Sequence, residues 1–337
     1  MRRFCATFLV CAAFLCAKDK KKDPGQIGNR DVGKGINFYS LEREIALGKQ
    51  LAQEVQRQAK MIQDPIVTEY INRVGQNLAR NSDAKVPFTF QLIDDPGLNA
   101  FALPGGFIFV HSGLIKVAET EAELAGALAH EVAHVAARHM TRQATRSQIV
   151  NLATIPLLVL GGWTGYAVRQ GAGIGIPMTF LAFSRDYESE ADFLGVQYAY
   201  AAGYDPNGAI EVFEKMQSLE RTRPGVLSRV FATHPMNADR IRKSQQAIQE
   251  TLPPKPEYVV NTSHYEQVRL RLLSLENRRM DEEKDGRPTL RKAPGGGAGP
   301  AGSDERPPLK RRDLCGVTAS GLHTYQNMGA HLRDLGV

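Results

Sequence analysis

Two histidines and a glutamate are grouped in one pentapeptide, His130-Glu-Val-Ala-His134. On an α-helix, residues four apart project from the same face, so both imidazoles can bind one metal ion while Glu131 reaches a metal-bound water from the side. This spacing is typical of zinc hydrolases. The alternative is a helix whose histidines only line a core, but core histidines need no glutamate in register. The pentapeptide therefore predicts a catalytic site with one Zn²⁺ per chain.

A catalytic zinc ion usually has three protein ligands and an open position, so a third ligand must lie elsewhere. Metzincin spacing is excluded, because Ala137 and Met140 stand where that class needs Gly and His. His139 lies roughly 140° round the helix from His134, as follows from 3.6 residues per turn. We therefore expect His139 to point away from the metal as a helix-surface residue.

A second acidic motif, Glu188-Ser-Glu-Ala-Asp192, offers the missing ligand. Glu188 and Asp192 share one helix face, so Glu188 can bind the metal while Asp192 accepts the free ring N–H of a ligand histidine. Glu190 is rotated away, and we expect it to be solvated. An acidic helix start is otherwise only a complement to the helix dipole. Beside a zinc motif, the ligand role is the favoured interpretation.

Helix signals surround both motifs. Thr120 and Glu123 form a capping box that predicts one long helix running through the pentapeptide to about Ala144. Asp64 followed by Pro65 has the pattern of an N-cap and a first helical residue. Besides these, helices are expected from Ser40 and over 186–202, 206–219, 238–250 and 264–279.

Alternating apolar residues predict strands over 87–93 and 107–110. Between them, proline and paired glycines indicate a turn or bulge at a sheet edge. We expect the stretch from Phe101 to Val110 to supply an edge to which an extended peptide pairs by main-chain hydrogen bonds. The residues expected at this edge are Asn99, Phe101, Leu103, Pro104, Gly105 and Gly106.

The charge distribution argues against nucleic acid as a partner. The 337 residues carry a formal charge of +6, but the basic excess lies at the two ends of the chain. A nucleic-acid surface needs Lys and Arg clustered on one folded face, which a balanced central region does not supply. We expect polypeptide substrates, and no specific protein partner is indicated.

The chain divides into four expected parts. Residues 1–17 combine two arginines, a short apolar run and a small residue, which is the pattern of a secretory signal peptide. Residues 18–37 are expected to form a flexible lead, 38–279 a zinc metallopeptidase domain, and 280–337 a disordered, basic, Pro/Gly-rich tail. The pattern favours an exported protein in the periplasm or envelope, with membrane anchorage as the alternative.

Residues 148–168 approach the length of a membrane span, but Pro156, Asn151 and several glycines interrupt them. A hairpin that is buried or touches a membrane surface is the favoured interpretation. The glycine-rich segment 171–177 lacks the strand and lysine of a phosphate loop, so we interpret it as a linker.

Four motifs together resemble the gluzincin metallopeptidases that include the CAAX prenyl protease, the heat-shock membrane protease and the periplasmic β-barrel-assembly-enhancing protease. They are HEVAH at 130–134, ESEAD at 188–192, NAFALPGG at 99–106, and Thr233-His-Pro235 with Arg240 six residues after the histidine. The resemblance covers roughly residues 38–250. After it, no helical repeat pattern follows, so substrate recruitment through such repeats is not expected.

The resemblance implies a mostly helical, zincin-like catalytic domain of α+β class, built round the HExxH helix, with a small antiparallel or mixed sheet. It implies His130, His134 and Glu188 as zinc ligands, Glu131 as general base, and Asp192 as the partner of a ligand histidine. In periplasmic members, the histidine matching His234 can bind the zinc and block the open position. For this chain, a loop histidine that caps the next helix is an equal alternative.

The resemblance also implies a role for Arg240, which could pair with a carboxylate or contact the substrate carbonyl as a catalytic group. The function expected is zinc-dependent endopeptidase activity on unfolded or misassembled exported proteins. A chaperone-like envelope protein with an idle or self-blocked zinc site is the main alternative. A membrane-embedded processing enzyme is a third, and it requires residues 148–168 to span lipid.

Overall fold

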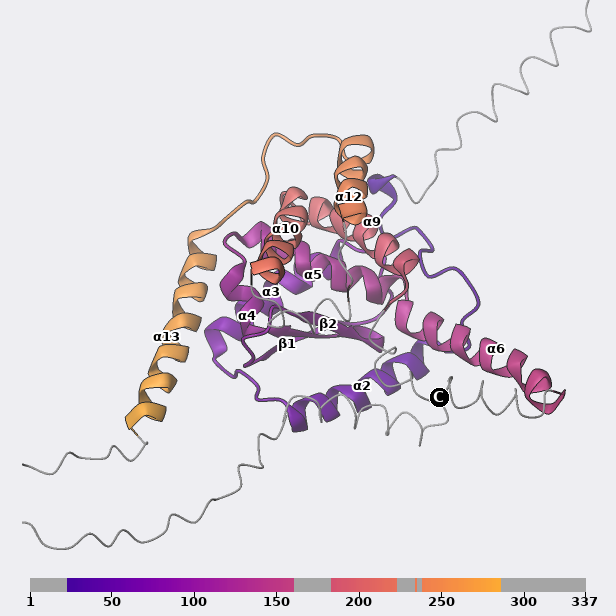
Figure 1. Ribbon diagram of the computed structural model, residues 1–337. Coiled ribbons are helices and arrows are strands. Elements are labelled where there is room, and N and C mark those ends of the chain that lie inside the picture. Colours follow the sequence, from indigo (N-terminus) through magenta and orange to yellow (C-terminus); the bar gives the residue numbers. More distant parts are fainter. Residues whose placement is uncertain (1–22, 161–182, 223–233, 235–237, 286–337) are drawn as a thin grey trace, which may run out of the picture.

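The computed structural model describes residues 23–160, 183–222, 234 and 238–285. The predicted signal peptide 1–17, the end of the apolar stretch 161–168, the segment 171–177 and most of the predicted tail lie outside these residues. In Figure 1, helices cover both faces of a small sheet. In chain order the helices are α2 (Leu41–Gln58), α3 (Pro65–Arg80), α4 (Ser112–Val117), α5 (Glu121–Ala136), α6 (His139–Leu160), α9 (Arg185–Ala201), α10 (Asn207–Thr222), α12 (Ala238–Thr251) and α13 (Ser263–Asp285). The predicted α+β class is confirmed.

The sheet has the strands β1 (Thr89–Ile93), β2 (Ala100–Leu103) and β3 (Phe107–His111), in the order β1-β3-β2. β3 runs parallel to β1 and antiparallel to β2, so the sheet is mixed. The stretch from Phe101 to Val110, expected as one edge, is two strands joined by the short helix η4 (Pro104–Gly106). Gly105 and Gly106 have φ of 72° and 94°, which only glycine adopts readily. The paired glycines therefore form the predicted turn.

Alternation along the strands divides the core into two layers. Phe101, Leu103 and Phe109 pack with α2 on one face of the sheet. Ala100, Ala102, Ile108 and Val110 belong to the cluster that α3 and α5 complete on the other face. Figure 1 shows α2 below the sheet and α5 above it. β2 thus lies at a sheet edge directly beside the helix that carries HEVAH.

The helix predicted to run to about Ala144 is wrong in one respect, because it breaks in the middle. α5 ends at Ala136, Arg138 takes a φ of 56°, and α6 begins at His139. A positive φ is unfavourable for arginine, but tertiary contacts hold it here. Arg138 Nε donates to Glu44 at 2.7 Å and Nη2 to the Tyr39 carbonyl at 2.6 Å. The break turns the chain after the second histidine of the motif.

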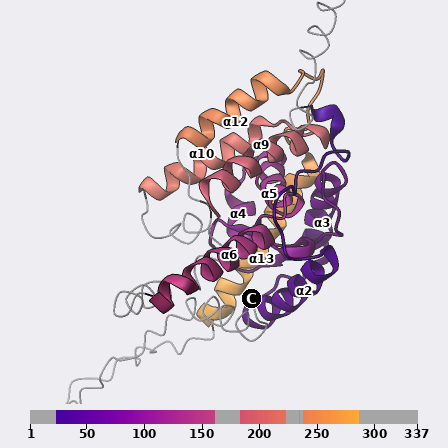
Figure 2. The same cartoon turned by 90° about the vertical axis from the view of Figure 1, so that its right-hand side faces the viewer.

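The helices predicted after the pentapeptide are confirmed, with boundaries within a few residues of those expected. α9 and α10 pack on α5, and α12 packs on both (Figure 2). Two glycines allow this close approach. A Cβ at Gly126 of α5 would lie 2.4 Å from Ala209 Cα, and one at Gly195 of α9 would lie 3.2 Å from His130 Cα. The acidic motif on α9 is therefore pressed against the histidine motif on α5.

Part of the segment expected to be a flexible lead is instead held against the fold. Arg30 is only 4% exposed and forms an ion pair of 2.6 Å with Asp83. At the other end, α13 continues to Asp285, beyond the expected domain limit at residue 279.

Residues 148–160 of the apolar stretch lie in α6, so no hairpin forms within them. Within the described ranges, no helix has both the length and the apolar composition needed to cross a bilayer.

Candidate metal centre

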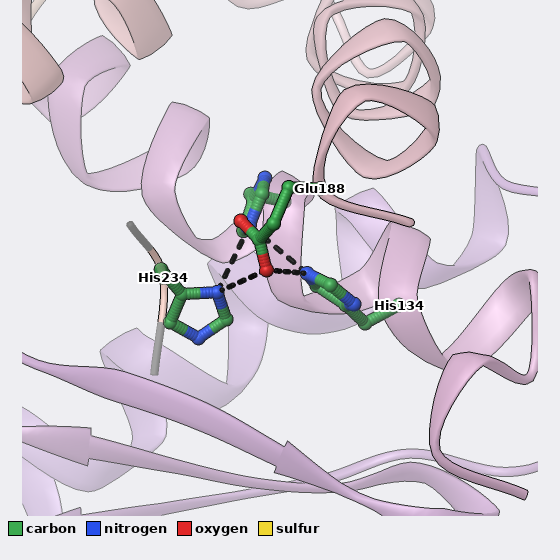
Figure 3. Close-up of side chains that lie close together, drawn as sticks. His134, Glu188 and His234 are labelled. Atoms are coloured by element: carbon green, nitrogen blue, oxygen red, sulfur yellow. Dashed lines mark hydrogen bonds and ion pairs between the residues drawn. The ribbon is translucent and has the colours of Figure 1, made fainter. Parts of the chain in front are cut away.

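Four buried side chains converge above the sheet. His130 and His134 come from α5, Glu188 from α9, and His234 from the connection between α10 and α12. One donor atom from each lies within 4.8 Å of all the others, and none of the four residues is more than 7% exposed. Figure 3 shows the Glu188 carboxylate between the rings of His134 and His234. Together these donors could hold one metal ion.

Four of the distances between these donor atoms are close to those expected around a bound zinc ion. Zinc–ligand bonds of about 2.0–2.1 Å place the donors of a tetrahedron roughly 3.3 Å apart. The two ligand-histidine Nε2 atoms are 3.0 Å apart, and His234 Nδ1 lies 3.4 Å from His130 Nε2 and 3.0 Å from Glu188 Oε1. Glu188 Oε1 is 3.5 Å from His134 Nε2. The donor set, three imidazoles and one carboxylate, is one that zinc accepts.

The charges around His130 also favour a cation. Asp192 Oδ1 lies 3.0 Å from His130 Nδ1, so the proton on that nitrogen faces a carboxylate and Nε2 points toward the other donors. Burial lowers the pKa of His130, but Asp192 and Glu188 outweigh it and raise this pKa to about 10. The carboxylates that attract a proton to His130 would also attract a metal cation.

Glu131 lies beside the cluster without joining it. It is 3% exposed, and its Oε1 is 3.5 Å from His234 Nε2. Burial raises the pKa of this carboxyl group. A carboxylate with a raised pKa is better suited to accept and return a proton than an exposed one.

A small cavity of about 30 Å³ opens next to His130, Glu131 and His234. Its other lining residues are mostly apolar: Leu98, Ala100, Leu114, Ala127, Phe213 and Met216. Asn99 also lines it and is 4% exposed, and its Oδ1 has no hydrogen-bond partner among the described residues. Of the residues expected at the substrate edge, Asn99 therefore lies at the site. Phe101 and Leu103 instead face α2.

Arg240 contacts carboxylates, which is one of the two alternatives left open by its sequence position. Its Nε and Nη2 each lie 2.7 Å from an oxygen of Asp192, and Nη1 lies 2.8 Å from Glu188 Oε2. These contacts hold the pKa of Asp192 below its usual range, despite a burial that raises it. Arg240 thus contacts both acidic residues that approach the histidines and offsets part of their negative charge.

His139 and Glu190 are not where the sequence analysis expected them. His139 is fully buried, with Nδ1 3.0 Å from His134 Nδ1 and Nε2 3.2 Å from Glu190 Oε2. The expectation of a helix-surface histidine is wrong because α5 ends before this residue. The 3.6-residue period of α5 therefore does not give the direction of the His139 side chain. The break itself has no strong sequence signal, since the segment contains neither glycine nor proline.

A family profile described as Peptidase family M48 matches residues 65–248, more than half of the chain. The chain belongs to peptidase family M48. This M48 match spans α3 to α12, and so includes all four donors, Glu131 and Arg240.

Individual relatives are named as proteases, in agreement with this assignment. The chain is 29% identical to the beta-barrel assembly-enhancing protease of Yersinia pestis over 256 residues, 73% of this chain and 51% of that protein. It is 34% identical to the putative beta-barrel assembly-enhancing protease of Vibrio cholerae over 226 residues, 64% and 46% of the two chains. It is 36% identical to the mitochondrial metalloendopeptidase OMA1 of Schizosaccharomyces pombe over 188 residues, 54% and 53%. The chain spans about half the length of these relatives.

Proposed function

We propose that this chain is a zinc-dependent endopeptidase that cleaves unfolded or misassembled exported polypeptides. The observation that carries the proposal is the buried cluster of His130, His134, Glu188 and His234 next to a buried Glu131. Membership of a peptidase family and similarity to proteins named as proteases support it.

Each residue has a distinct task in this proposal. His130, His134 and Glu188 hold the ion, and Asp192 keeps the His130 ring in the tautomer that presents Nε2 to it. A zinc ion held there would supply Lewis acidity for the attacking water and for the peptide carbonyl. Glu131 would accept a proton from the water as its oxygen bonds to the carbonyl carbon, and would deliver that proton to the amine as the C–N bond breaks.

The substrate is expected to lie along β2. Among the described residues, this strand pairs only with β3, and it packs beside α5, which supports placing the substrate along its other edge. An extended peptide added there would pair mainly through its backbone, which makes selection largely independent of side chains. Asn99 directly precedes β2, and its Oδ1, which has no hydrogen-bond partner in the described part of the chain, is positioned to accept a backbone N–H from the peptide.

His234 acts as a reversible fourth ligand in this proposal. Its Nδ1 is 3.0 Å from Glu188 and its Nε2 faces Glu131, so it occupies the position that a catalytic water needs. The ring must move away for cleavage. If it never moves, the chain is the chaperone-like protein with a self-blocked site, and activity measurements distinguish the two.

The test is cleavage of casein by the purified, zinc-loaded chain, with and without a chelator. We expect proteolysis that the chelator abolishes and added zinc restores. A Glu131→Gln variant should keep its zinc but lose cleavage, while Glu214→Gln, an exposed change on α10, should behave like the parent. Undiminished cleavage by Glu131→Gln would falsify the proposed base. Full zinc occupancy without cleavage would favour the self-blocked alternative.

A further inference from the structure

We propose that Glu190 and His139 form a hydrogen-bonded relay that positions His134 for metal binding. His139 and Glu190 are thus positioning residues, which act on the ion only through His134. This inference rests on the proposed metal site, and it assigns a role to Glu190, the acidic residue of the ESEAD motif to which the proposed function gives none.

The contacts form one continuous chain of side chains. His134 Nδ1 lies 3.0 Å from His139 Nδ1, and His139 Nε2 lies 3.2 Å from Glu190 Oε2. The two imidazoles are 2% and 0% exposed, so water cannot replace these contacts. Buried ring nitrogens without partners are costly, which makes the arrangement specific.

The direction of the hydrogen bonds follows from the chemistry of the end groups. A carboxylate only accepts, so His139 Nε2 carries a proton and donates it to Glu190. In a neutral ring, His139 Nδ1 then accepts from the Nδ1–H of His134. That leaves the lone pair of His134 on Nε2, the atom that faces the other metal donors. The relay therefore selects the metal-binding tautomer of His134.

Carboxylates of α9 support both ligand histidines, but they do so in different ways. His130 Nδ1 reaches Asp192 directly, at 3.0 Å. His134 lies one turn further along α5 and reaches Glu190 only through the interposed ring of His139. Among the described residues, His139 is the group that meets His134 Nδ1.

The fold holds His139 in place from several sides. The break at Arg138 turns the start of α6 back toward the metal centre, which a continuous helix would not do. The ring of Tyr187 stacks on His139, with centroids 4.6 Å apart and planes inclined by 18°. Arg142 lies over Tyr187 and contacts Glu190 at 3.2 Å. These contacts fix the ring plane that the relay needs.

The test measures zinc affinity by competition with a chromophoric chelator, in the absence of substrate. His139→Phe keeps a ring that can stack on Tyr187 but removes both hydrogen bonds, and we expect zinc binding to weaken about 10- to 100-fold. His139→Asn retains an acceptor near the Nδ1 position and should recover most of the affinity. Glu190→Gln should give an intermediate loss, and it covers the case in which His139→Phe does not fold.

The control is Asp186→Asn, which removes an exposed carboxylate from the same helix and should bind zinc like the parent. Circular dichroism of the zinc-free proteins checks that each variant is folded. Parent-like affinity in a folded His139→Phe or Glu190→Gln variant overturns the relay. The relay is also overturned if His139→Asn binds zinc no more tightly than His139→Phe, because the hydrogen bond to His134 then has no effect on zinc affinity.

The outcomes separate this inference from the proposed function. A parent chain that binds zinc but cleaves no casein contradicts the function, while the affinity series still decides the relay. A parent that cleaves casein, together with a His139→Phe variant of unchanged affinity, contradicts the relay alone. A parent that binds no zinc overturns both.

Discussion

Arg240 binds Asp192 through two hydrogen bonds of 2.7 Å, and both side chains are only 5% exposed. The pair joins α12 to α9 behind the metal centre, and a third guanidinium nitrogen contacts Glu188 at 2.8 Å. Arg240 therefore offsets the repulsion between two carboxylates that are buried close together.

Replacing Arg240 with Met should destabilise the fold strongly. Removing one partner of a buried ion pair leaves an uncompensated charge, which typically costs about 3–5 kcal/mol. Urea unfolding of the zinc-free chain measures this loss, and Arg240→Lys should recover part of it because the charge remains. A Met variant as stable as the parent would show that the pair is not a structural element.

The ion pair illustrates what the sequence could and could not predict. The spacing within HEVAH and within ESEAD predicted which side chains share a face of each helix, because helical periodicity fixes that face. It left the partner of Arg240 open, because α12 and α9 approach one another only in the tertiary structure. Most helices were predictable from their caps and apolar stripes.

His139 shows where sequence reasoning fails. The 3.6-residue period holds only while the helix continues, and the break depends on Arg138 contacts to Tyr39 and Glu44, about 95 residues earlier in the chain. No local pattern contains that information. A similar long-range contact, between Arg30 and Asp83, orders part of the segment that its composition marked as flexible.

Replacing His234 with Ala should increase the rate of casein cleavage. The ring occupies the position of a fourth ligand, so its removal should open that position to water while three protein ligands remain. Zinc affinity should fall at the same time, because one donor is lost. Initial cleavage rates at saturating zinc measure the effect. Slower cleavage at full zinc occupancy would indicate that His234 assists the reaction instead of blocking it.

The contact between Asp64 and Arg271 should make stability depend on pH. Arg271 Nη2 lies 2.7 Å from Asp64, and this contact lowers the pKa of the carboxyl group, although partial burial opposes it. A carboxyl group whose pKa is lowered by folding stabilises the fold at pH values above its pKa in the unfolded chain, about 3.9. That contribution is lost as the pH falls through its pKa in the folded chain.

The matched variant is Asp64→Asn, which keeps an N-cap for α3 but removes the charge. Its stability deficit relative to the parent should be present at neutral pH and shrink as the pH is lowered below about 4. Urea unfolding at a series of pH values measures the difference, with Asp186→Asn as a control. A deficit that stays constant over this range would exclude the ion pair as its cause.

The central claim is that side chains from α5 and α9 hold one zinc ion, and anomalous diffraction from crystals of the zinc-loaded chain tests it most directly. The account predicts a single anomalous peak at the zinc edge, about 2.0–2.2 Å from the Nε2 atoms of His130 and His134 and from a carboxylate oxygen of Glu188. A map without a peak between these three residues, or with Glu188 more than about 3 Å from it, would contradict the account.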